Sequence, residues 1–293
     1  DVAVAGVQAC ALPICAARYP RLRIKVDLYP HGTSFIGKLA RTLQRVPSRF
    51  VMLQAQDDFP VPGGVEACVG ELERNPQYAA ARGRIGRFFL GHDGSPAAVN
   101  LTLIPHAMRA YLADDPVERV VDHLKNYAST LYSVHRRESL LGAFEQTAAA
   151  TQHVIFFQYP SSALTVLSGK VWCGEELYYV RQNHRESWGA KAKREDRDHW
   201  PQLLVAPDYS KRYAQFRTAL AGALARVKGA APESFYELLD DAAVEMLVGS
   251  ICARRFEDPA EASFMQKLKT AGTPERMELE NIVQFVMRYP QTY

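Results

Sequence analysis

Two adjacent carboxylates, Asp57 and Asp58, follow a run of mostly apolar residues at positions 50–55. Such a run is typical of a buried strand, and ligands of open α/β sheets bind beyond the carboxyl ends of strands. Mg²⁺ and Mn²⁺ prefer oxygen ligands, and Mg²⁺ commonly shares them with substrate phosphates. The pattern therefore indicates a metal–nucleotide site at a sheet edge. A strand followed by a solvated acidic turn is the alternative, and the short motif alone leaves both open.

Four segments together resemble bacterial family-2-like glycosyltransferases, whose catalytic domain has the GT-A fold. They are residues 49–78, which contain the acids and an Asn-Pro-Gln-Tyr turn, and residues 127–138, 167–171 and 178–187. The resemblance covers residues 19–188 and depends on the order and spacing of the four segments. It implies transfer of a sugar, with inversion, from a nucleotide-diphosphate donor to an acceptor that is a glycan, a lipid or a protein.

The resemblance also implies roles for the acidic cluster. In the family the last acid usually ligates the metal, so Asp58 is expected to hold a Mg²⁺ or Mn²⁺ ion that bridges the diphosphate. Asp57 and Gln56 are expected to contact the nucleotide sugar. Gln56 replaces the family's first acid, and its amide can bond a ribose hydroxyl but brings no charge. Gln158 stands where the family has a catalytic base, and an amide cannot accept a proton as a carboxylate does.

Five further residues are candidates by the same resemblance. Asp27 is expected to end a strand and bind the nucleobase, and His135 and Arg136 are expected on a helix beside the acceptor or diphosphate pocket. There the Arg136 guanidinium would neutralise a leaving phosphate. Arg181 is expected to contact the diphosphate, and His184 to be a further metal ligand. Three of the five have a structural alternative: a turn aspartate for Asp27, and an interfacial pair for His135 and Arg136.

Two functions from different classes remain open. The retained acids and cations favour a metal-assisted glycosyltransferase. The neutral residues Gln56 and Gln158 favour a non-catalytic relative that binds a nucleotide sugar or serves as a structural partner. The chain contains no Walker A loop, GxGxxG, HExxH or GxSxG sequence that would indicate another enzyme class.

The composition is that of an ordinary globular protein. The 293 residues are 47% hydrophobic and 23% charged, and 35 basic against 32 acidic residues give a net charge of +3. This balance gives no electrostatic argument for a nucleic-acid partner. No apolar stretch is long enough for a transmembrane helix. The five cysteines form no CxxC pair, which predicts reduced thiols in a cytoplasmic protein.

The first residues of the chain are interpreted as non-native. Within residues 1–14, the sequence GVQACALPI resembles the translation of a sequencing-library adapter. We expect no central strand from this segment, so the first strand of the GT-A fold and its nucleotide-contacting loop would be missing and the fragment inactive. An ordinary apolar N-terminal segment is the alternative.

The elements that must position these residues follow from hydrophobic periodicity. Strands are expected at residues 22–28, 50–55 and within 79–104, with a strand pair at 171–180; helices are expected at residues 33–46, 63–75, 116–134 and 158–169. This alternation predicts an α/β, GT-A-like domain with a mainly parallel sheet flanked by helices at residues 15–190. Helical periodicity from residue 209 onward predicts a helical C-terminal subdomain at residues 191–293.

Overall fold

The computed structural model describes residues 2–5, 27–55, 58–89, 100–103, 109–151, 156–183 and 209–251, together with residues 266–267, 270–274, 276–277, 280–281 and 284. The chain divides into two compact units. The first comprises Asp1–Leu112 and Ala128–His184, and the second comprises Ala113–Tyr127 and Arg185–Tyr293. The sheet and the described candidate site residues belong to the first unit.

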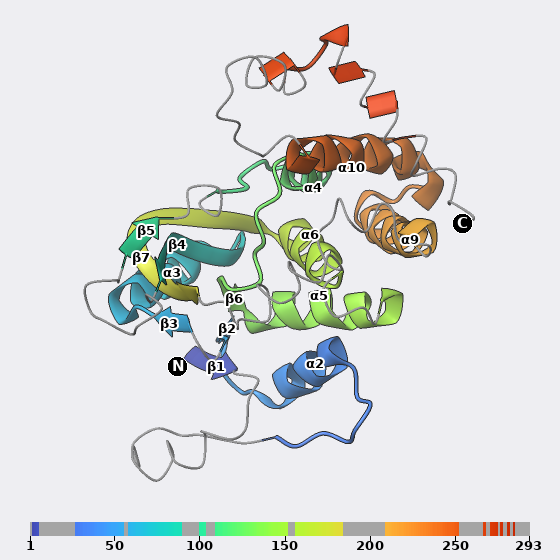
Figure 1. The fold of residues 1–293 in the computed structure, drawn as a ribbon. Helices are drawn as coiled ribbons and strands as arrows, with labels where there is room; N and C mark the ends of the chain where they lie inside the picture. The colour runs from blue at the N-terminus through green and yellow to red at the C-terminus, as the bar shows by residue number, and fades with distance from the viewer. Residues whose placement is uncertain are drawn as a thin grey trace, which may run out of the picture. The chain divides into compact units, whose positions relative to one another are not determined.

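A seven-stranded sheet forms the centre of the first unit (Figure 1). Its order is β1-β2-β6-β4-β7-β3, with β5 paired to β4. The strands are β1 (Val2–Ala5), β2 (Phe50–Leu53), β3 (Asp58–Pro60), β4 (Tyr78–Phe89), β5 (Asn100–Leu103), β6 (Val134–Arg136) and β7 (Lys170–Asn183). The pairs β1–β2 and β4–β7 are parallel, whereas β2–β6, β4–β6, β4–β5 and β3–β7 are antiparallel. The sheet is therefore mixed, and the prediction of a mainly parallel sheet is wrong.

The antiparallel strand β6 explains much of this difference. The helix predicted over residues 116–134 ends much earlier, since α4 spans Pro116–Lys125 and Asn126 caps it by donating to the Asp122 carbonyl. A turn then leads into β6, with the Ser133 N–H bonded to the Thr130 carbonyl at 2.9 Å. A strand that enters from a turn does not need the helical crossover that joins parallel neighbours.

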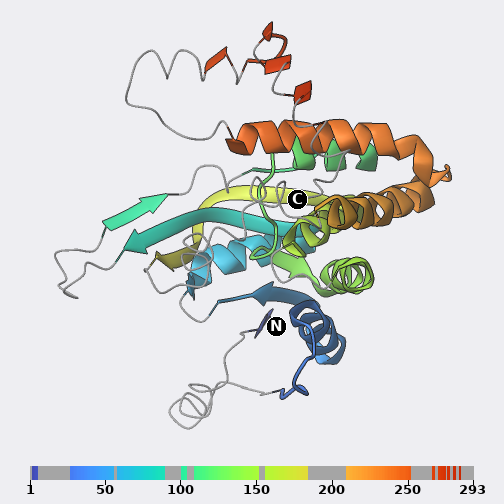
Figure 2. The ribbon, with the colours of Figure 1, turned by 45° about the vertical axis from the view of Figure 1, so that its right-hand side comes forward.

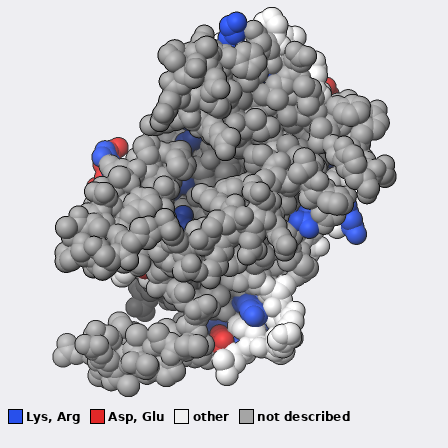
Figure 3. Space-filling view, viewed as in Figure 1, with Lys and Arg blue, Asp and Glu red and all other residues white. Residues whose placement is uncertain are grey.

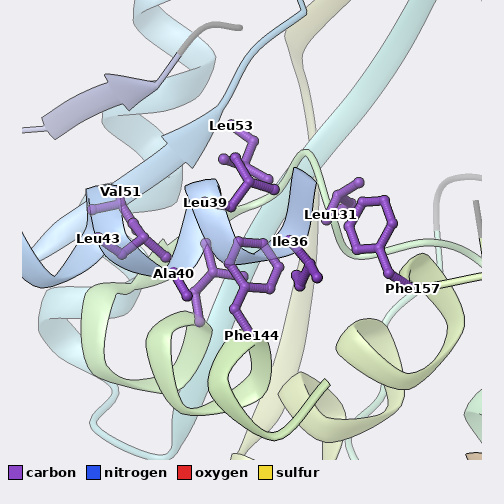
Figure 4. Close-up of a cluster of buried hydrophobic side chains, with 10 residues drawn as sticks. Ile36, Leu39, Ala40, Leu43, Val51, Leu53, Leu131, Phe144 and Phe157 are labelled. Carbon is purple, nitrogen blue, oxygen red and sulfur yellow. The ribbon is translucent and has the colours of Figure 1, made fainter. Parts of the chain in front are cut away.

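Strand β2 separates two apolar clusters because its side chains alternate between the faces of the sheet. Val51 and Leu53 pack with helix α2 (Phe35–Arg45) and helix α5 (Arg137–Ala150), which lie side by side (Figures 1 and 4). Phe50 and Met52 pack on the other face with Cys68 and Leu72 of helix α3 (Pro62–Arg74). Burial on both faces accounts for the continuous apolar run from which this strand was predicted.

The helices predicted beside the sheet are confirmed at three places. Helix α2 begins after Ser34, whose side chain accepts a bond from the Gly37 N–H at 3.2 Å, and helices α3 and α6 (Gln158–Ser168) lie close to their expected bounds. Gly64 allows α3 to approach β7 closely, since a Cβ there would lie 2.3 Å from the Leu177 carbonyl oxygen. This contact holds α3 against the strand that carries Tyr179 and Arg181.

Two strand predictions need correction. Residues 171–180 do not form a strand pair but part of the single long strand β7, which pairs along β4 and curves with it (Figure 2). Asp27 and Leu28, the last two residues of the strand predicted at 22–28, lie in an irregular segment, and residues 22–26 lie outside the described part.

The N-terminal segment contributes a strand to the sheet. Val2–Ala5 pairs in parallel with Phe50–Leu53, at the end of the described strand order, so it is an edge strand there and not a central one. For these four residues, the prediction that the segment forms no central strand is confirmed. The alanines at alternate positions have low β-propensity, so the formation of this strand depends on its pairing with the buried strand β2.

The second unit is helical where the structure describes it. It contains α4, α9 (Tyr209–Lys228), the 3₁₀ helix η3 (Pro232–Phe235) and α10 (Tyr236–Ile251). Tyr213 and Arg217 of α9 both bond to the Asp240 carboxylate of α10, at 2.5 and 2.8 Å. The helical periodicity predicted from residue 209 is thus confirmed for α9 and α10. Among the described residues, no helix has the length and apolarity needed to cross a membrane.

Candidate functional site

Asp58 begins strand β3, one turn after the buried strand β2. Its N–H bonds to the Ala55 carbonyl at 3.3 Å, and Gln54 Nε2 donates to the Asp58 carbonyl at 2.7 Å. The antiparallel register places Asp58 opposite Arg181 of β7. Asp58 is only 3% exposed. The acid predicted at the carboxyl end of a strand is therefore buried at the first residue of the next strand.

Two side chains of β7 contact the Asp58 carboxylate. The Tyr179 hydroxyl donates to Oδ2 at 2.9 Å, and Arg181 Nε lies 3.5 Å from the same oxygen. Residues two apart on a strand point to the same face, which is why Tyr179 and Arg181 reach one partner. Burial raises the pKa of Tyr179, and the negative charge of Asp58 raises it further. The hydroxyl therefore stays protonated near neutral pH and remains a donor.

Tyr132 completes this group, which we call the acid–arginine cluster: Asp58, Tyr132, Tyr179 and Arg181. The Tyr132 and Tyr179 rings are stacked, with centroids 5.6 Å apart and planes at 24°. The Arg181 guanidinium lies 5.2 Å from the Tyr132 ring centroid, within cation–π range. The Arg181 side chain is 42% exposed, while that of Asp58 is 2% exposed. The cluster thus joins a buried anion to a cation that a dissolved ligand can reach.

His135 and Arg136 lie on strand β6, so their predicted placement on a helix is wrong. His135 is fully buried, and its Nε2 lies 2.8 Å from the Thr130 carbonyl oxygen. A carbonyl can only accept, so Nε2 carries the proton. Burial lowers the pKa of His135 to about 4, so the ring is neutral near neutral pH. These contacts stabilise the turn before β6.

Arg136 also bonds to the backbone. Nε donates to the Tyr78 carbonyl at 2.8 Å, and Nη2 donates to the carbonyls of Leu72 and of Asn75, the latter at 3.1 Å. Leu72 is in the last turn of α3 and Asn75 is its C-cap. Because the final carbonyls of a helix have no intrahelical donor, Arg136 stabilises this helix end. The structure thus gives Arg136 a role in the fold, and its predicted contact with a leaving phosphate remains a prediction.

Asp27 and Gln158, the other sequence-predicted residues that the structure describes, lie elsewhere in the first unit. An Asp27 oxygen lies 3.4 Å from a nitrogen of Arg45 in α2. Gln158 is half-buried as the first residue of α6, where Phe157 before it packs into the core. Gln56, Asp57 and His184 lie outside the described residues.

Asp58 is the predicted metal ligand that lies within the described part of the chain, and the metal itself remains a prediction. No group of three or more histidine, cysteine, aspartate or glutamate side chains in the described part could hold a metal ion. Asp58, the predicted ligand, already accepts from Tyr179 and pairs with Arg181 through Oδ2. A cation at this oxygen would meet the guanidinium at close range, and the two positive charges would repel each other.

Figure 3 shows where charged side chains of the described residues reach the surface on one face. The lysine and arginine side chains visible there among the described residues are scattered and partly adjacent to acidic ones. Sequence reasoning missed Tyr132 and Tyr179. The alternation along residues 178–181 was the available signal, because it places Tyr179 on the same face as Arg181.

Comparisons with known proteins give little more. No protein-family model matches the sequence, and no curated protein matches it. Among solved structures, the chain is similar to residues 1–349 of S. aureus TarS, at 11% sequence identity and a TM-score of 0.39. The match covers 98% of this chain and 80% of TarS 1–349. A similarity at this TM-score says nothing about function.

Proposed function

We propose that this chain is a glycosyltransferase-type domain that binds a nucleotide-diphosphate sugar at the acid–arginine cluster and transfers the sugar to an acceptor. The observation that carries the proposal is the convergence of separate sequence segments. Residues 49–78 supply Asp58, residues 127–138 supply Tyr132, and residues 178–187 supply Tyr179 and Arg181. Three of the four segments that resemble family-2-like glycosyltransferases thus meet in one cluster of contacts.

The cluster offers suitable chemistry for such a donor. A guanidinium can make two parallel hydrogen bonds to a phosphate group. In the proposed complex Arg181 binds the diphosphate and stabilises the negative charge that develops on the leaving nucleotide. The Tyr132 ring beneath the guanidinium limits its motion, and Asp58 fixes its Nε, so the cation is oriented before the donor arrives.

The described residues supply less of the chemistry that the acceptor side of the reaction requires. Attack on the anomeric carbon requires removal of a proton from the acceptor hydroxyl. Gln158 can accept a hydrogen bond from that hydroxyl through its amide oxygen, but it cannot take the proton. We therefore propose an orienting role for Gln158 and assign the base to no described residue.

A non-catalytic nucleotide-sugar-binding protein is the second candidate. The neutral side chain at position 158 favours it, and so does the commitment of Asp58 to Tyr179 and Arg181. Both candidates require donor binding, and only the first requires turnover.

Binding and turnover can be measured on the same protein. Calorimetric titration with UDP and with GDP, followed by incubation with UDP-glucose or GDP-mannose, measures affinity and release of nucleoside diphosphate. We expect binding of at least one nucleotide, and release above the protein-free blank if the domain is an enzyme. Arg41→Ala serves as the control because Arg41 is an exposed arginine on α2. Binding without release would favour the second candidate, and absence of binding would contradict both.

A further inference from the structure

The charge at the acid–arginine cluster differs from that of a metal site. A metal site presents carboxylates whose oxygens are open to a cation. Here the buried carboxylate faces a guanidinium at 3.5 Å and a tyrosine hydroxyl at 2.9 Å. The Asp58–Arg181 pair is already close to electrically neutral, so a divalent cation would find little net attraction. The positive charge that reaches solvent belongs to Arg181.

We infer that Arg181 itself supplies the cation for the donor's diphosphate, so this site binds a diphosphate without a divalent metal ion. The inference rests on the proposed function, because it takes the diphosphate of that donor as the ligand. It replaces the metal expected from the sequence with a guanidinium that the chain carries permanently.

The backbone makes this cation a fixed part of the site. Asp58 and Arg181 are opposite residues of an antiparallel pair, so the sheet itself determines their separation. The Tyr132 ring lies on the guanidinium at 5.2 Å from its centroid, and Tyr132 in turn stacks on Tyr179. A guanidinium carries five N–H groups, more than the Asp58 contact uses. It is therefore able to hold its position and still bind phosphate oxygens in a bidentate way.

Asp58 takes a different role in this arrangement. It orients Arg181 and competes with the diphosphate for the guanidinium. Replacing its charge with the nearly isosteric amide of asparagine removes the competing anion while an oxygen remains to accept from Tyr179. A metal-binding Asp58 predicts the opposite, because loss of the ligand would weaken the bridge between metal and diphosphate.

The test is calorimetric titration with inorganic pyrophosphate in EDTA, and with UDP both in EDTA and in Mn²⁺. The proteins are the wild-type chain, Arg181→Ala, Arg181→Lys, Asp58→Asn and the exposed-arginine control Arg41→Ala. We expect UDP to bind equally well in EDTA and in Mn²⁺. Arg181→Ala should weaken both probes by about tenfold or more, as expected for the loss of charge-assisted bonds. Arg181→Lys should fall between, because it keeps the charge but loses the planar fork.

The Asp58→Asn result gives the sharpest contrast. Pyrophosphate should bind this variant in EDTA at least as tightly as it binds the wild type. UDP binding that requires Mn²⁺ and disappears in Asp58→Asn would overturn the inference and leave the proposed function intact. UDP binding in EDTA that Arg181→Ala does not change would overturn the inference, and with it the diphosphate contact proposed for Arg181, while nucleotide binding by the domain would stand. Absence of binding to either probe under every condition would overturn the inference and the proposed function together.

Discussion

Strand β6 and the β3–β7 pair each carry charged or titratable residues that the sequence marked as candidates, yet the two places use them differently. On β6, inside the sheet, His135 and Arg136 direct their ring nitrogen and guanidinium to backbone carbonyls. At the β3 edge, Asp58 and Arg181 face each other, and one of them remains 42% exposed. In this sheet, the charged or titratable residues inside the sheet bond to backbone carbonyls, while the arginine at the edge can remain available to a ligand.

Arg82 of β4 follows the interior pattern. It is fully buried, and its guanidinium donates to the carbonyls of Arg109 and Ser129, the latter at 3.0 Å. Carbonyls of irregular segments need donors when they are buried, and a long arginine side chain can supply several at once. All three residues are arginines, so position in the sheet, and not residue type, distinguishes Arg82 and Arg136 from Arg181.

Replacing Arg136 and Arg181 by alanine should lower the free energy of unfolding by unequal amounts, and Arg136→Ala should have the largest effect. Arg136→Ala should lower the free energy of unfolding by about 3 kcal/mol, because several carbonyls lose their donor. Arg181→Ala should lower it by about 1 kcal/mol, since its partner contact is long and half open to solvent. Urea denaturation followed by circular dichroism measures both. Equal losses would remove the distinction between interior and edge.

Acid should destabilise the interior of the sheet through His135. The folded pKa of about 4 lies below the ordinary value of 6.5, so the unfolded chain binds the proton more readily. The contribution of the neutral ring is fully present above pH 6.5 and is lost as the pH falls toward 4. Between pH 7 and pH 5 the loss should be about 2 kcal/mol.

The His135→Gln variant isolates this effect, because glutamine can still donate to the Thr130 carbonyl and does not titrate. Its free energy of unfolding should change less than that of the wild type over the same pH range. His31→Gln, at an exposed histidine, is the control and should retain the wild-type pH dependence. A His135→Gln protein with the full wild-type dependence would show that another group is responsible.

Tyr179→Phe should lower the free energy of unfolding less than Arg136→Ala does, because it removes a single buried hydrogen bond. The ring stays stacked on Tyr132, but Asp58 loses one donor, which should cost about 1–2 kcal/mol. The same variant should loosen the position of Asp58 and so alter pyrophosphate affinity, whereas His135→Gln should not. Thermal unfolding measures the change in stability, and calorimetry measures the pyrophosphate affinity. An unchanged pyrophosphate affinity in Tyr179→Phe would argue against a site that Tyr179 and Arg181 share.

Hydrophobic periodicity predicted much of the fold around β2. The buried run at residues 50–53 and helices α2 and α3 have strong local signals: a continuous apolar run, Ser34 before α2, and Asn75-Pro76 after α3. Strand direction has no such signal. Three-residue strands such as β3 and β6 are specified by their partners across the sheet, so the mixed pairing could not be read from the sequence.

For the candidate site, the sequence likewise predicted individual residues but not how they pair. Asp58 and Arg181 are charged residues within short motifs, and the sequence predicted both as site residues. Their pairing is a long-range contact set by the β3–β7 register, and no local pattern encodes that register. The same limit explains why Arg136 was assigned to a ligand: its partners at Leu72, Asn75 and Tyr78 are distant in the sequence.

Hydrogen exchange followed by mass spectrometry, with and without saturating UDP and separately GDP, tests the contrast between edge and interior most directly. We predict that at least one nucleotide slows exchange in peptides that cover β3 and the end of β7 around Arg181, and leaves peptides that cover β6 unchanged. Slower exchange at β6 with none at β3 and β7, or no change with either nucleotide, would contradict the assignment of the acid–arginine cluster as the ligand site.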